Sequence, residues 1–576
     1  MTMIETKLER IISSSLKNLG LDVIKFDLNR DESNQGRGDY ATNVALVSFS
    51  HKGSRRLAKN SFELAKEIVK EIEKLASSEI KKVEAVAPGF INFYLIDQFF
   101  IRVLSEVIKK GSNFGKQTIG QGKTVVIDYS APNIAKPFGI GHLRSTIIGQ
   151  ALYNIFTFLG YQTIGDNHLG DWGTQFGTLL YQIKIKKLDP QELTIKDLEK
   201  LYVDFHQKLK KEPKLKEEAR NYFKRLESGE IELKQIWQNL VDLSLVEYKK
   251  IYQLLKVDID IALGESFYLD KMGAVLVDAK NKGLVVKSQK ALIMPLEDVL
   301  VPAMLVKSDG ATTYLLRDLA TIKYRIGRWQ PELIIYEVGA DQLLYFDQVF
   351  EAAEKLGYVN RKNLIHVAHG MIRGSFGKLS TREGKTIHLE EVLREAIKRA
   401  KQLSKKSGIA EGLSTVKQAE VVRMVGIGAV KYNDLKQNPR TDIVFDWEKI
   451  LSLEGNSGPY LQYTYARTQS LLEKANKEVN LKKVPEYQLK KEELAIVRLI
   501  CYFEGVIAKS ARTFSPNLIT NFIYQLARDY NTFYGKYQVL ADDQEARHFR
   551  LLLTKATAIV LKNGLGLLGI ETPKKM

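Results

Sequence analysis

Two stretches of this 576-residue chain combine glycines, cations and a helix start in a way that could bind phosphate. In the first, IDYSAPNIAKPFGIGHLRST (residues 127–146), an apolar strand pattern leads through a Pro- and Gly-bearing turn into a helix. Free backbone N–H groups and the helix dipole make such a helix start attractive to anions. Gly139 and Gly141 let a phosphate or adenine approach the backbone closely. His142 can donate to a phosphate oxygen and Lys136 supplies a mobile cation, although a plain strand–turn–helix connection has the same pattern.

The second stretch, GMIRGSFGKLSTREGKTIHLEEVL, starts at Gly370, after an apolar strand pattern and before a helical one. Mobile loops with cations suit a triphosphate whose charge is redistributed in a transition state. The alternative is a solvated basic loop. The side chains that this Gly-flanked loop offers are Lys378, Ser380, Thr381, Arg382 and Lys385.

GIGH, followed more than two hundred residues later by KLSTR, resembles the HIGH and KMSKS pair of class I aminoacyl-tRNA synthetases. Further segments resemble arginyl-tRNA synthetases, and together they span essentially the whole chain. These segments are APNIAKPF, GHLRSTIIGQAL, NHLGDWGTQFG, GESFY, GAVKYNDL, SGPYLQYTYAR and LGIETP. The resemblance implies that arginine and ATP form arginyl-adenylate and pyrophosphate. Arginine is then transferred to the terminal ribose of tRNA(Arg), releasing AMP. It also implies that activation requires bound tRNA, which fits completion of the site by induced fit.

On the family pattern, ATP is bound by the two glycine-bearing loops. Two departures stand out: Gly139 replaces the first histidine of HIGH, and Thr381 replaces a lysine of KMSKS. Loss of a preorganised donor can raise a barrier by roughly 2.7–4 kcal/mol, so we expect Lys136 and Arg382 to compensate; an impaired enzyme is the alternative. Mg²⁺ is expected with ATP, held by phosphates and water. The implied catalytic residues are His142, Lys136, Lys378 and Arg382, and the ATP-binding residues are Gly139, Gly141, His142, Lys378 and Ser380.

A site for arginine needs carboxylates and amide oxygens that meet a guanidinium fork. Tyr314 and Asp318 are four residues apart and hence on one helix face. By resemblance Tyr314 packs on the substrate stem, Asp318 and Gln342 take the guanidinium, and Asn133 and Glu265 hold the α-amino end. NHLGDWGTQFG adds His168, which shapes this loop or acts as an acid/base, near a carboxyl strand end where ligands bind.

Aromatic and basic residues mix in the C-terminal third, where rings can stack on splayed bases and cations can meet phosphates. An aromatic stripe in a helix can equally be core. By resemblance Phe90 and Asn92 contact the tRNA elbow, while Ala87 replaces a polar residue at a third such position. The implied tRNA-binding residues are Phe90, Asn92, Tyr460, Tyr463, Arg467, Tyr530 and Met576.

The patterns along the chain predict an α/β protein of three domains. Residues 1–105 form an α+β domain, and the resemblance makes it the one that binds the tRNA elbow. Residues 106–395 alternate strands and helices as a Rossmann-like parallel-sheet catalytic domain, with a charged helical insertion at about 185–255. We expect its most polar stretch, residues 184–220, to be a lid or connective arm rather than core. Residues 396–576 are almost wholly helical, and the resemblance makes them the anticodon-binding bundle.

The overall composition limits the possible partners and cellular location of the protein. The formal net charge is +18, which suits either solubility or a polyanionic partner. Cys501 is the only cysteine, which excludes a disulfide framework and a Cys-based zinc site and predicts a buried thiol in a reducing cytoplasm. No apolar run approaches the roughly 20 residues of a membrane span, so we expect a cytoplasmic protein without a membrane partner, and the family suggests a monomer.

Two rival functions differ in their partners. A related ligase or nucleotidyltransferase would act on something other than tRNA, but such relatives commonly lack the helical C-terminal domain. A tRNA-binding scaffold without activity has only Gly139 in its favour. Binding of arginine would argue against the first rival. ATP turnover in the presence of tRNA would argue against the second.

Overall fold

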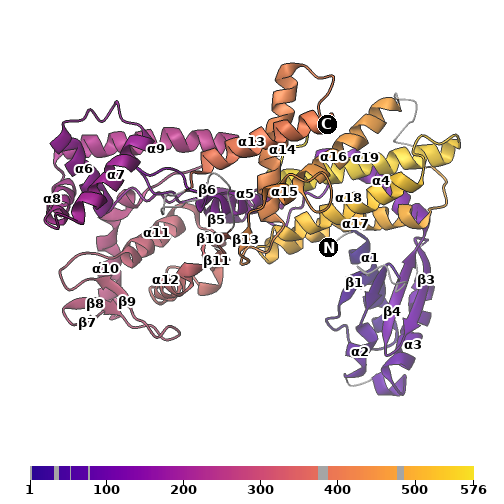
Figure 1. Cartoon of the computed structure of the whole chain (residues 1–576). Helices are drawn as coiled ribbons and strands as arrows, with labels where there is room; N and C mark the ends of the chain where they lie inside the picture. Colours follow the sequence, from indigo (N-terminus) through magenta and orange to yellow (C-terminus); the bar gives the residue numbers. More distant parts are fainter. Residues whose placement is uncertain (1–2, 31–37, 52–53, 76–77, 374–386, 476–484) are drawn as a thin grey trace.

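The structure is a computed structural model that describes residues 3–30, 38–51, 54–75, 78–373, 387–475 and 485–576. Figure 1 shows a central sheet with a helical insertion at one end. At the other end, C-terminal helices carry the N-terminal domain. The predicted fold class is confirmed: along the chain, an α+β domain is followed by a parallel-sheet α/β region and then by a helical region.

The N-terminal domain packs three helices against a four-stranded antiparallel sheet of order β1-β2-β4-β3. Residues Leu64, Ile68 and Ile72, spaced by four, form the buried stripe of α3. Asp39 ties this domain to the C-terminal helices, because it accepts a 2.6 Å ion-pair hydrogen bond from Arg498. The elements are α1 (Met3–Asn18), β1 (Leu28–Arg30), β2 (Tyr40–Thr42), α2 (Val44–Phe49), the 3₁₀ helix η1 (Ser54–Arg56), α3 (Ser61–Leu75), β3 (Ile80–Val86) and β4 (Phe90–Leu95).

Four parallel strands form the central sheet in the order β11-β10-β5-β6, as the alternating pattern predicts. Alternate residues of β5 face two different cores: Val125 and Ile127 join the core shared with α5, and Val126 joins the core under α10, α11 and α12. All four carboxyl ends therefore meet at one edge, where ligands of such sheets bind. The elements are β5 (Thr124–Asp128), α5 (His142–Phe158), β6 (Gln162–Asp166), α10 (Met272–Asn281), α11 (Tyr314–Trp329), β10 (Leu333–Gly339), η4 (Ala340–Gln342), α12 (Leu343–Lys355), η5 (Arg361–Asn363) and β11 (Leu364–His369).

The insertion consists of α6 (Thr174–Lys186), α7 (Ile195–Leu209), α8 (Leu215–Glu227) and α9 (Ile231–Leu255). Helix α9 follows the stretch that we expect to lie outside the core, and its inner face, including Leu240, Tyr248 and Ile251, is buried in the main core. The apolar residues of α9 recur at helical spacing beneath many charged residues, so its mean polarity hides a buried stripe. Figure 1 shows α9 running from the insertion back toward the sheet.

A small antiparallel sheet interrupts the parallel pattern and was not predicted. Its strands are β7 (Val286–Ser288), β8 (Ala291–Met294) and β9 (Ala303–Val306), in that order. The preceding 3₁₀ helix, η3 (Glu265–Lys271), carries GESFY. Thr313 caps α11 and its hydroxyl donates to the carbonyl of Met304 in β9 at 2.6 Å. The small sheet therefore sets the start of the helix that carries Tyr314 and Asp318.

The C-terminal region packs its helices together and against α4, which precedes the central sheet. Lys431 lies at the junction: its buried ammonium donates to the carbonyls of Leu255 and Gly569, both at 2.6 Å. The elements are α4 (Asp97–Lys110), η2 (Gly111–Asn113), β12 (Ile372–Arg373), α13 (Leu389–Ser407), α14 (Thr415–Leu435), β13 (Ile443–Val444), α15 (Trp447–Ile450), α16 (Gly458–Lys474), α17 (Lys491–Arg512), α18 (Asn517–Lys536) and α19 (Gln544–Leu567).

Two predictions from composition have structural outcomes. Cys501 in α17 is half-buried rather than fully buried, since it lies at the edge of the helix's apolar stripe. Among the described residues, no helix is both long enough and apolar enough to cross a bilayer.

Candidate active site

The loop between β5 and α5 holds three non-glycine residues in the left-handed region. The angle φ is 74° at Ser130, 42° at Ala131 and 63° at Ala135, and such backbone costs of order 1–3 kcal/mol per residue. Side chains from other elements stabilise it: Asn167 accepts from the Ala131 N–H at 3.0 Å, and Ser244 accepts from the Ala135 N–H at 2.9 Å. Strain of this kind clusters at functional sites, which favours a binding loop over a plain connection.

Helix α9 forms the base of this loop. The Tyr248 hydroxyl contacts the carbonyl oxygens of Asn133 at 2.6 Å and of Lys136 at 2.9 Å. The Phe138 ring lies edge-on to Tyr248 and to Tyr252, with centroids 5.3 and 5.7 Å apart. The insertion thus fixes the backbone of both Asn133 and Lys136.

The N-terminus of α5 has free hydrogen-bonding capacity. No side chain caps it, and its N-cap, Gly141, is exposed. The Nδ1 atom of His142 is buried and has no hydrogen-bond partner among the described residues. Burial lowers the pKa of His142, so its imidazole is neutral near pH 7. The N–H groups of His142 and Leu143 already donate to the carbonyls of Gly139 and Ile140, both at 3.0 Å, so an anion can be received at the imidazole and at the exposed Gly141.

Gly139 lies directly opposite His388 in a short antiparallel bridge. His388, the residue before α13, contacts the Glu199 carboxylate of α7 at 3.1 Å. The Lys136 ammonium lies 5.1 Å from the ring centroid of Tyr202, also on α7. Helix α7 therefore contacts the phosphate loop directly through Tyr202, and Glu199 contacts the residue that pairs with Gly139.

The second predicted loop lies outside the described residues. This applies to Lys378, Ser380 and Arg382, and to Thr381 and Lys385 beside them. Their roles stay predictions.

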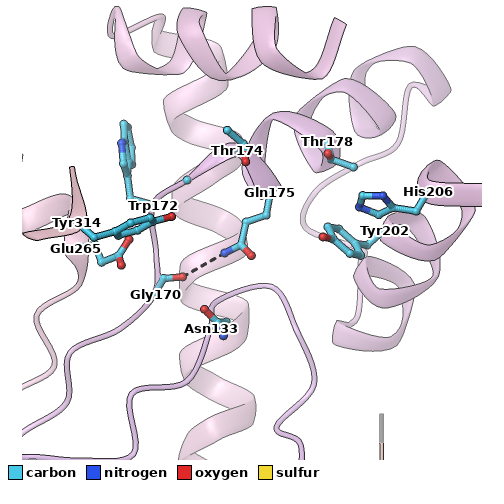
Figure 2. Close-up of a pocket in the computed structure, with 11 residues that line it drawn as sticks. Asn133, Gly170, Trp172, Thr174, Gln175, Thr178, Tyr202, His206, Glu265 and Tyr314 are labelled. Atoms are coloured by element: carbon cyan, nitrogen blue, oxygen red, sulfur yellow. Dashed lines mark hydrogen bonds between the residues drawn. The ribbon is translucent and has the colours of Figure 1, made fainter. Parts of the chain in front are cut away.

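A cavity of about 320 Å³ opens next to the phosphate loop. In Figure 2, Tyr202 and His206 of α7 lie on one side, and Tyr314 and Glu265 lie on the other. It brings together three of the five predicted arginine ligands. Its lining residues are Asn133, Gly170, Trp172, Gly173, Thr174, Gln175, Thr178, Tyr202, His206, Glu265 and Tyr314.

Glu265 is already paired with an internal guanidinium. Arg317 Nη1 lies 2.5 Å from Glu265 Oε2, and its guanidinium lies over the Tyr314 ring at 5.0 Å from the centroid. Burial raises the pKa of Glu265 to about 7, against the lowering effect of Arg317. Near neutral pH, this carboxyl is therefore only partly ionised.

Asp318 follows one turn after Tyr314 but does not line the cavity as Tyr314 does. Its Oδ2 accepts a hydrogen bond from the Tyr345 hydroxyl, and its Oδ1 is 3.9 Å from His168 Nε2. Burial raises the pKa of Asp318 to about 6 and lowers the pKa of His168 to about 4. At pH 7 Asp318 is thus anionic and His168 is neutral. The fifth predicted ligand, Gln342, is exposed in η4 at the end of β10.

A buried ion cluster lies at the ends of β5 and β6. The Arg325 guanidinium donates to Asp128 at 2.7 Å and to Asp166 at 2.9 Å, and all three side chains are almost fully buried. Breaking such a cluster would leave a buried charge unpaired, which is costly. It therefore fixes α11, and with it Tyr314 and Asp318, against the strand ends.

On the helical region, Arg467 is held by aromatic rings. Its guanidinium lies 5.0 Å from the Tyr463 ring and 4.9 Å from the Tyr534 ring, and it donates to Asn531 Oδ1 at 2.8 Å. Asn531 in turn donates to the Tyr460 hydroxyl at 2.9 Å. Within the described part of the chain, no carboxylate lies within ion-pair distance of Arg467.

Three other predicted tRNA contacts have less favourable positions. Tyr530 is a correction: its ring is fully buried and its hydroxyl bonds to Thr554, because its position on α18 falls in the buried stripe. Asn92 is also buried, whereas Phe90 beside it is 37% exposed. Met576 packs against the main core and is half-buried.

Several site residues were not predicted: Arg317, Arg325 and Tyr345, and the α7 residues Glu199, Tyr202 and His206. Among these residues, only those of α7 could have been found from the sequence, because positions 199, 202 and 206 share one helix face. Among the described residues, no three His, Cys, Asp or Glu side chains gather as a metal site.

Comparison with known proteins gives matches along the whole chain. A family model described as tRNA synthetases class I (R), catalytic domain, matches residues 103–447. A model described as Arginyl tRNA synthetase N terminal domain matches residues 6–95, and one described as DALR anticodon binding domain matches residues 461–576.

Similar proteins cover the chain end to end. The arginine–tRNA ligase of Halothermothrix orenii is 41% identical over 578 residues, which is 99% of each chain. That of Clostridium kluyveri is 42% identical over 513 residues, covering 88% of this chain and 89% of the relative. The crystal structure of arginyl-tRNA synthetase from Plasmodium falciparum is 26% identical with a TM-score of 0.83, covering 100% of both chains. The Thermus thermophilus arginyl-tRNA synthetase has the same fold, with a TM-score of 0.82 at 22% identity over 100% of both chains.

Proposed function

Since this chain belongs to the arginyl-tRNA synthetase family of class I, we propose that the cavity of Figure 2 and the neighbouring Asp318 bind L-arginine, and that the N-terminus of α5 binds ATP. The activity is that of an arginine–tRNA ligase, which joins L-arginine to tRNA(Arg) at the expense of ATP. The observation that carries the assignment is the charge beside the cavity: Asp318, one helical turn after the cavity-lining Tyr314, is a carboxylate with no lysine or arginine partner among the described residues.

In the first step an oxygen of the arginine carboxylate attacks the α-phosphorus of ATP, and the bond to the departing pyrophosphate breaks. The second step transfers the arginyl group from the adenylate to a hydroxyl of the terminal ribose, releasing AMP. Neither step requires a covalent enzyme intermediate. Positioning of the reactants and stabilisation of phosphate charge are therefore the main contributions of the protein.

We propose the following roles at the arginine end. Tyr314, 60% exposed, offers its ring to the aliphatic stem of the substrate. Asp318 and Gln342 bind the guanidinium, while Asn133 and Glu265 hold the α-amino end. For Glu265 this role means sharing its carboxylate with Arg317.

At the ATP end we propose that His142, Gly141 and the backbone at Gly139 contact phosphate or adenine. Lys136 adds positive charge, and burial lowers its pKa. By the family pattern Lys378, Ser380 and Arg382 act from the second loop. Mg²⁺ would enter with ATP, held mainly by phosphate oxygens and water.

For tRNA we propose that the helical domain uses the partly exposed cluster around Arg467 to bind the anticodon loop, with Met576 near it, and that the N-terminal domain uses Phe90 on the elbow. Activation of arginine would require bound tRNA. We further propose a cytoplasmic monomer without a membrane partner. Robust pyrophosphate exchange in the absence of tRNA would contradict the tRNA requirement.

The test is aminoacylation of tRNA(Arg) with labelled arginine and ATP, for the wild type and Gly139→His side by side. We expect the wild type to charge tRNA and the added imidazole to change the rate only a few-fold, because the loop already has Lys136 and His142. A wild type that binds tRNA but charges none would favour a scaffold instead.

A further inference from the structure

Four carboxylates lie at or behind the arginine end of the site: Asp128, Asp166, Glu265 and Asp318. Two internal guanidinium groups pair with three of them. Arg325 pairs with Asp128 and Asp166, at 2.7 and 2.8 Å, and Arg317 pairs with Glu265 at 2.5 Å. Asp318 is the exception: within the described ranges no lysine or arginine lies within ion-pair distance of it.

The contacts of Asp318 are instead made by groups without charge. The Tyr345 hydroxyl of α12 donates to Oδ2, and His168 Nε2 is 3.9 Å from Oδ1. A phenol donates one hydrogen bond and adds no charge. Ionised Asp318 therefore keeps its full negative charge. Because its side chain is 25% exposed, lone pairs of the carboxylate remain accessible to a ligand.

We propose that Tyr345 is a positioning residue for arginine: its hydroxyl holds Asp318 in the orientation that receives a guanidinium, and so sets the selectivity of the enzyme for this cation over a neutral group of the same shape. The proposal rests on the function proposed above. It adds a residue outside the cavity lining, one that acts through Asp318 and does not touch the substrate.

Selectivity follows from the charge of the two candidate ligands. Citrulline has the length and planar end of arginine but carries a neutral urea. A guanidinium forms charge-assisted hydrogen bonds with an oriented carboxylate, roughly twice as strong as neutral ones. Without the Tyr345 hydroxyl the Asp318 carboxylate loses its orientation. The affinity for arginine then falls more than the affinity for citrulline. We expect KM for arginine to rise about tenfold, since hydrogen bonds to charged groups contribute about that much.

The pH profile gives a second readout. The Tyr345 hydrogen bond lowers the pKa of Asp318 against the raising effect of burial. Removing the hydroxyl should therefore move the loss of arginine affinity on acidification to higher pH. The titratable and charged groups that face Asp318 are Tyr345 from α12, His168 from the loop after β6, Asp128 from β5, Glu265 from η3, and Arg317 and Arg325 from its own helix.

The experiment compares the wild type, Tyr345→Phe and a matched control, Tyr358→Phe. Tyr358 also donates to a carboxylate, Asp278 at 2.5 Å, in the same half of the catalytic region but away from the cavity. For each protein, full-length and with tRNA(Arg), we would measure KM for arginine and for ATP between pH 6 and 8.5, and inhibition by citrulline.

We expect Tyr345→Phe to raise KM for arginine about tenfold at pH 7.5, to leave KM for ATP within twofold, to reduce discrimination against citrulline, and to shift the pH profile upward. Tyr358→Phe should change none of these. Equal behaviour of the two variants would overturn the proposal, as would equal rises in KM for arginine and ATP. If Tyr345→Phe does not fold, Tyr345→Met removes the same hydroxyl with an adaptable side chain. A wild type that neither binds nor charges arginine would instead overturn the proposed function.

Discussion

Asp318 beside the arginine pocket and Arg467 on the anticodon-side helices carry charges of opposite sign, and neither has an ion-pair partner of fixed charge among the described residues. Near the pocket, Arg317 and Arg325 are paired with other carboxylates, and Asp318 accepts a hydrogen bond from Tyr345. On the helices, Arg467 is enclosed by the Tyr463 and Tyr534 rings and has no carboxylate partner among the described residues.

This difference indicates what each region binds. A preorganised anion with neutral neighbours suits a cationic side chain. A guanidinium flanked by partly exposed rings suits phosphates and unstacked bases. In both regions the useful charge is held by uncharged partners, which orient it without neutralising it. Five changes test this comparison, given in order of expected effect.

The largest effect should follow Asp318→Asn, which keeps the shape but removes the negative charge. Losing one partner of a hydrogen-bonded charge pair costs about 2–5 kcal/mol. We therefore expect kcat/KM for arginine to fall by about 30-fold or more, with KM for ATP nearly unchanged, in aminoacylation assays. Asp278→Asn is the control, because Asp278 pairs with Lys323 outside the cavity. A comparable fall in kcat/KM for that control would show that the charge of Asp318 has no specific role in binding arginine.

Acidification should weaken arginine binding in two stages. Burial raises the pKa of Glu265 to about 7 and that of Asp318 to about 6. As pH falls from 8, each carboxyl gains a proton and loses its attraction for the cation, so affinity drops by up to about tenfold per unit for each group. Calorimetric titration with arginine checks this. In Asp318→Asn the lower stage should vanish, and an unchanged profile would contradict the assignment.

On the helical region, Arg467→Gln should weaken tRNA(Arg) binding about tenfold and reduce the salt dependence by about one unit of slope. The reason is that an unpaired cation is lost together with its stacking surface. Filter binding over a range of salt concentrations measures both. Arg528→Gln should do less, because Arg528 already lies 3.5 Å from Asp529. Equal losses of tRNA affinity in the two variants would mean that an ion pair with a neighbouring carboxylate does not decide which arginine binds RNA.

A smaller effect is expected where α7 meets the phosphate loop. Glu199→Gln weakens the contact to His388, the residue opposite Gly139. We expect KM for ATP to rise two- to fivefold while KM for arginine stays constant, since a charge-assisted hydrogen bond contributes about 1 kcal/mol at a partly exposed site. Glu391→Gln, whose carboxylate is 3.7 Å from His388, should change less.

The smallest effect should come from Tyr530→Phe. The buried hydroxyl bonds to Thr554, so its removal should cost about 1 kcal/mol of folding free energy and lower the thermal midpoint by a few degrees at most. Affinity for tRNA should not change. If it falls, the helix face that carries Tyr530 must reach RNA after all.

Local patterns predicted most of the scaffold. The strand and helix that carry GIGH are where periodicity places them, and the parallel sheet follows from alternation of strands and helices. Of the arginine candidates, Asn133, Glu265 and Tyr314 meet in one cavity. Tyr530 was predicted to contact tRNA but is buried, because one turn of a helix separates a surface ring from a core ring.

The sequence by itself determined the family, the order of the domains and the residue types able to bind arginine and phosphate, because motifs and periodicity are local properties. Only the tertiary structure decided which charges are compensated. Arg317 and Glu265 are 52 positions apart and Asp318 and Tyr345 are 27 apart, and neither pair has a sequence signal. Whether a carboxylate is neutralised or left free depends on which distant side chain packs beside it.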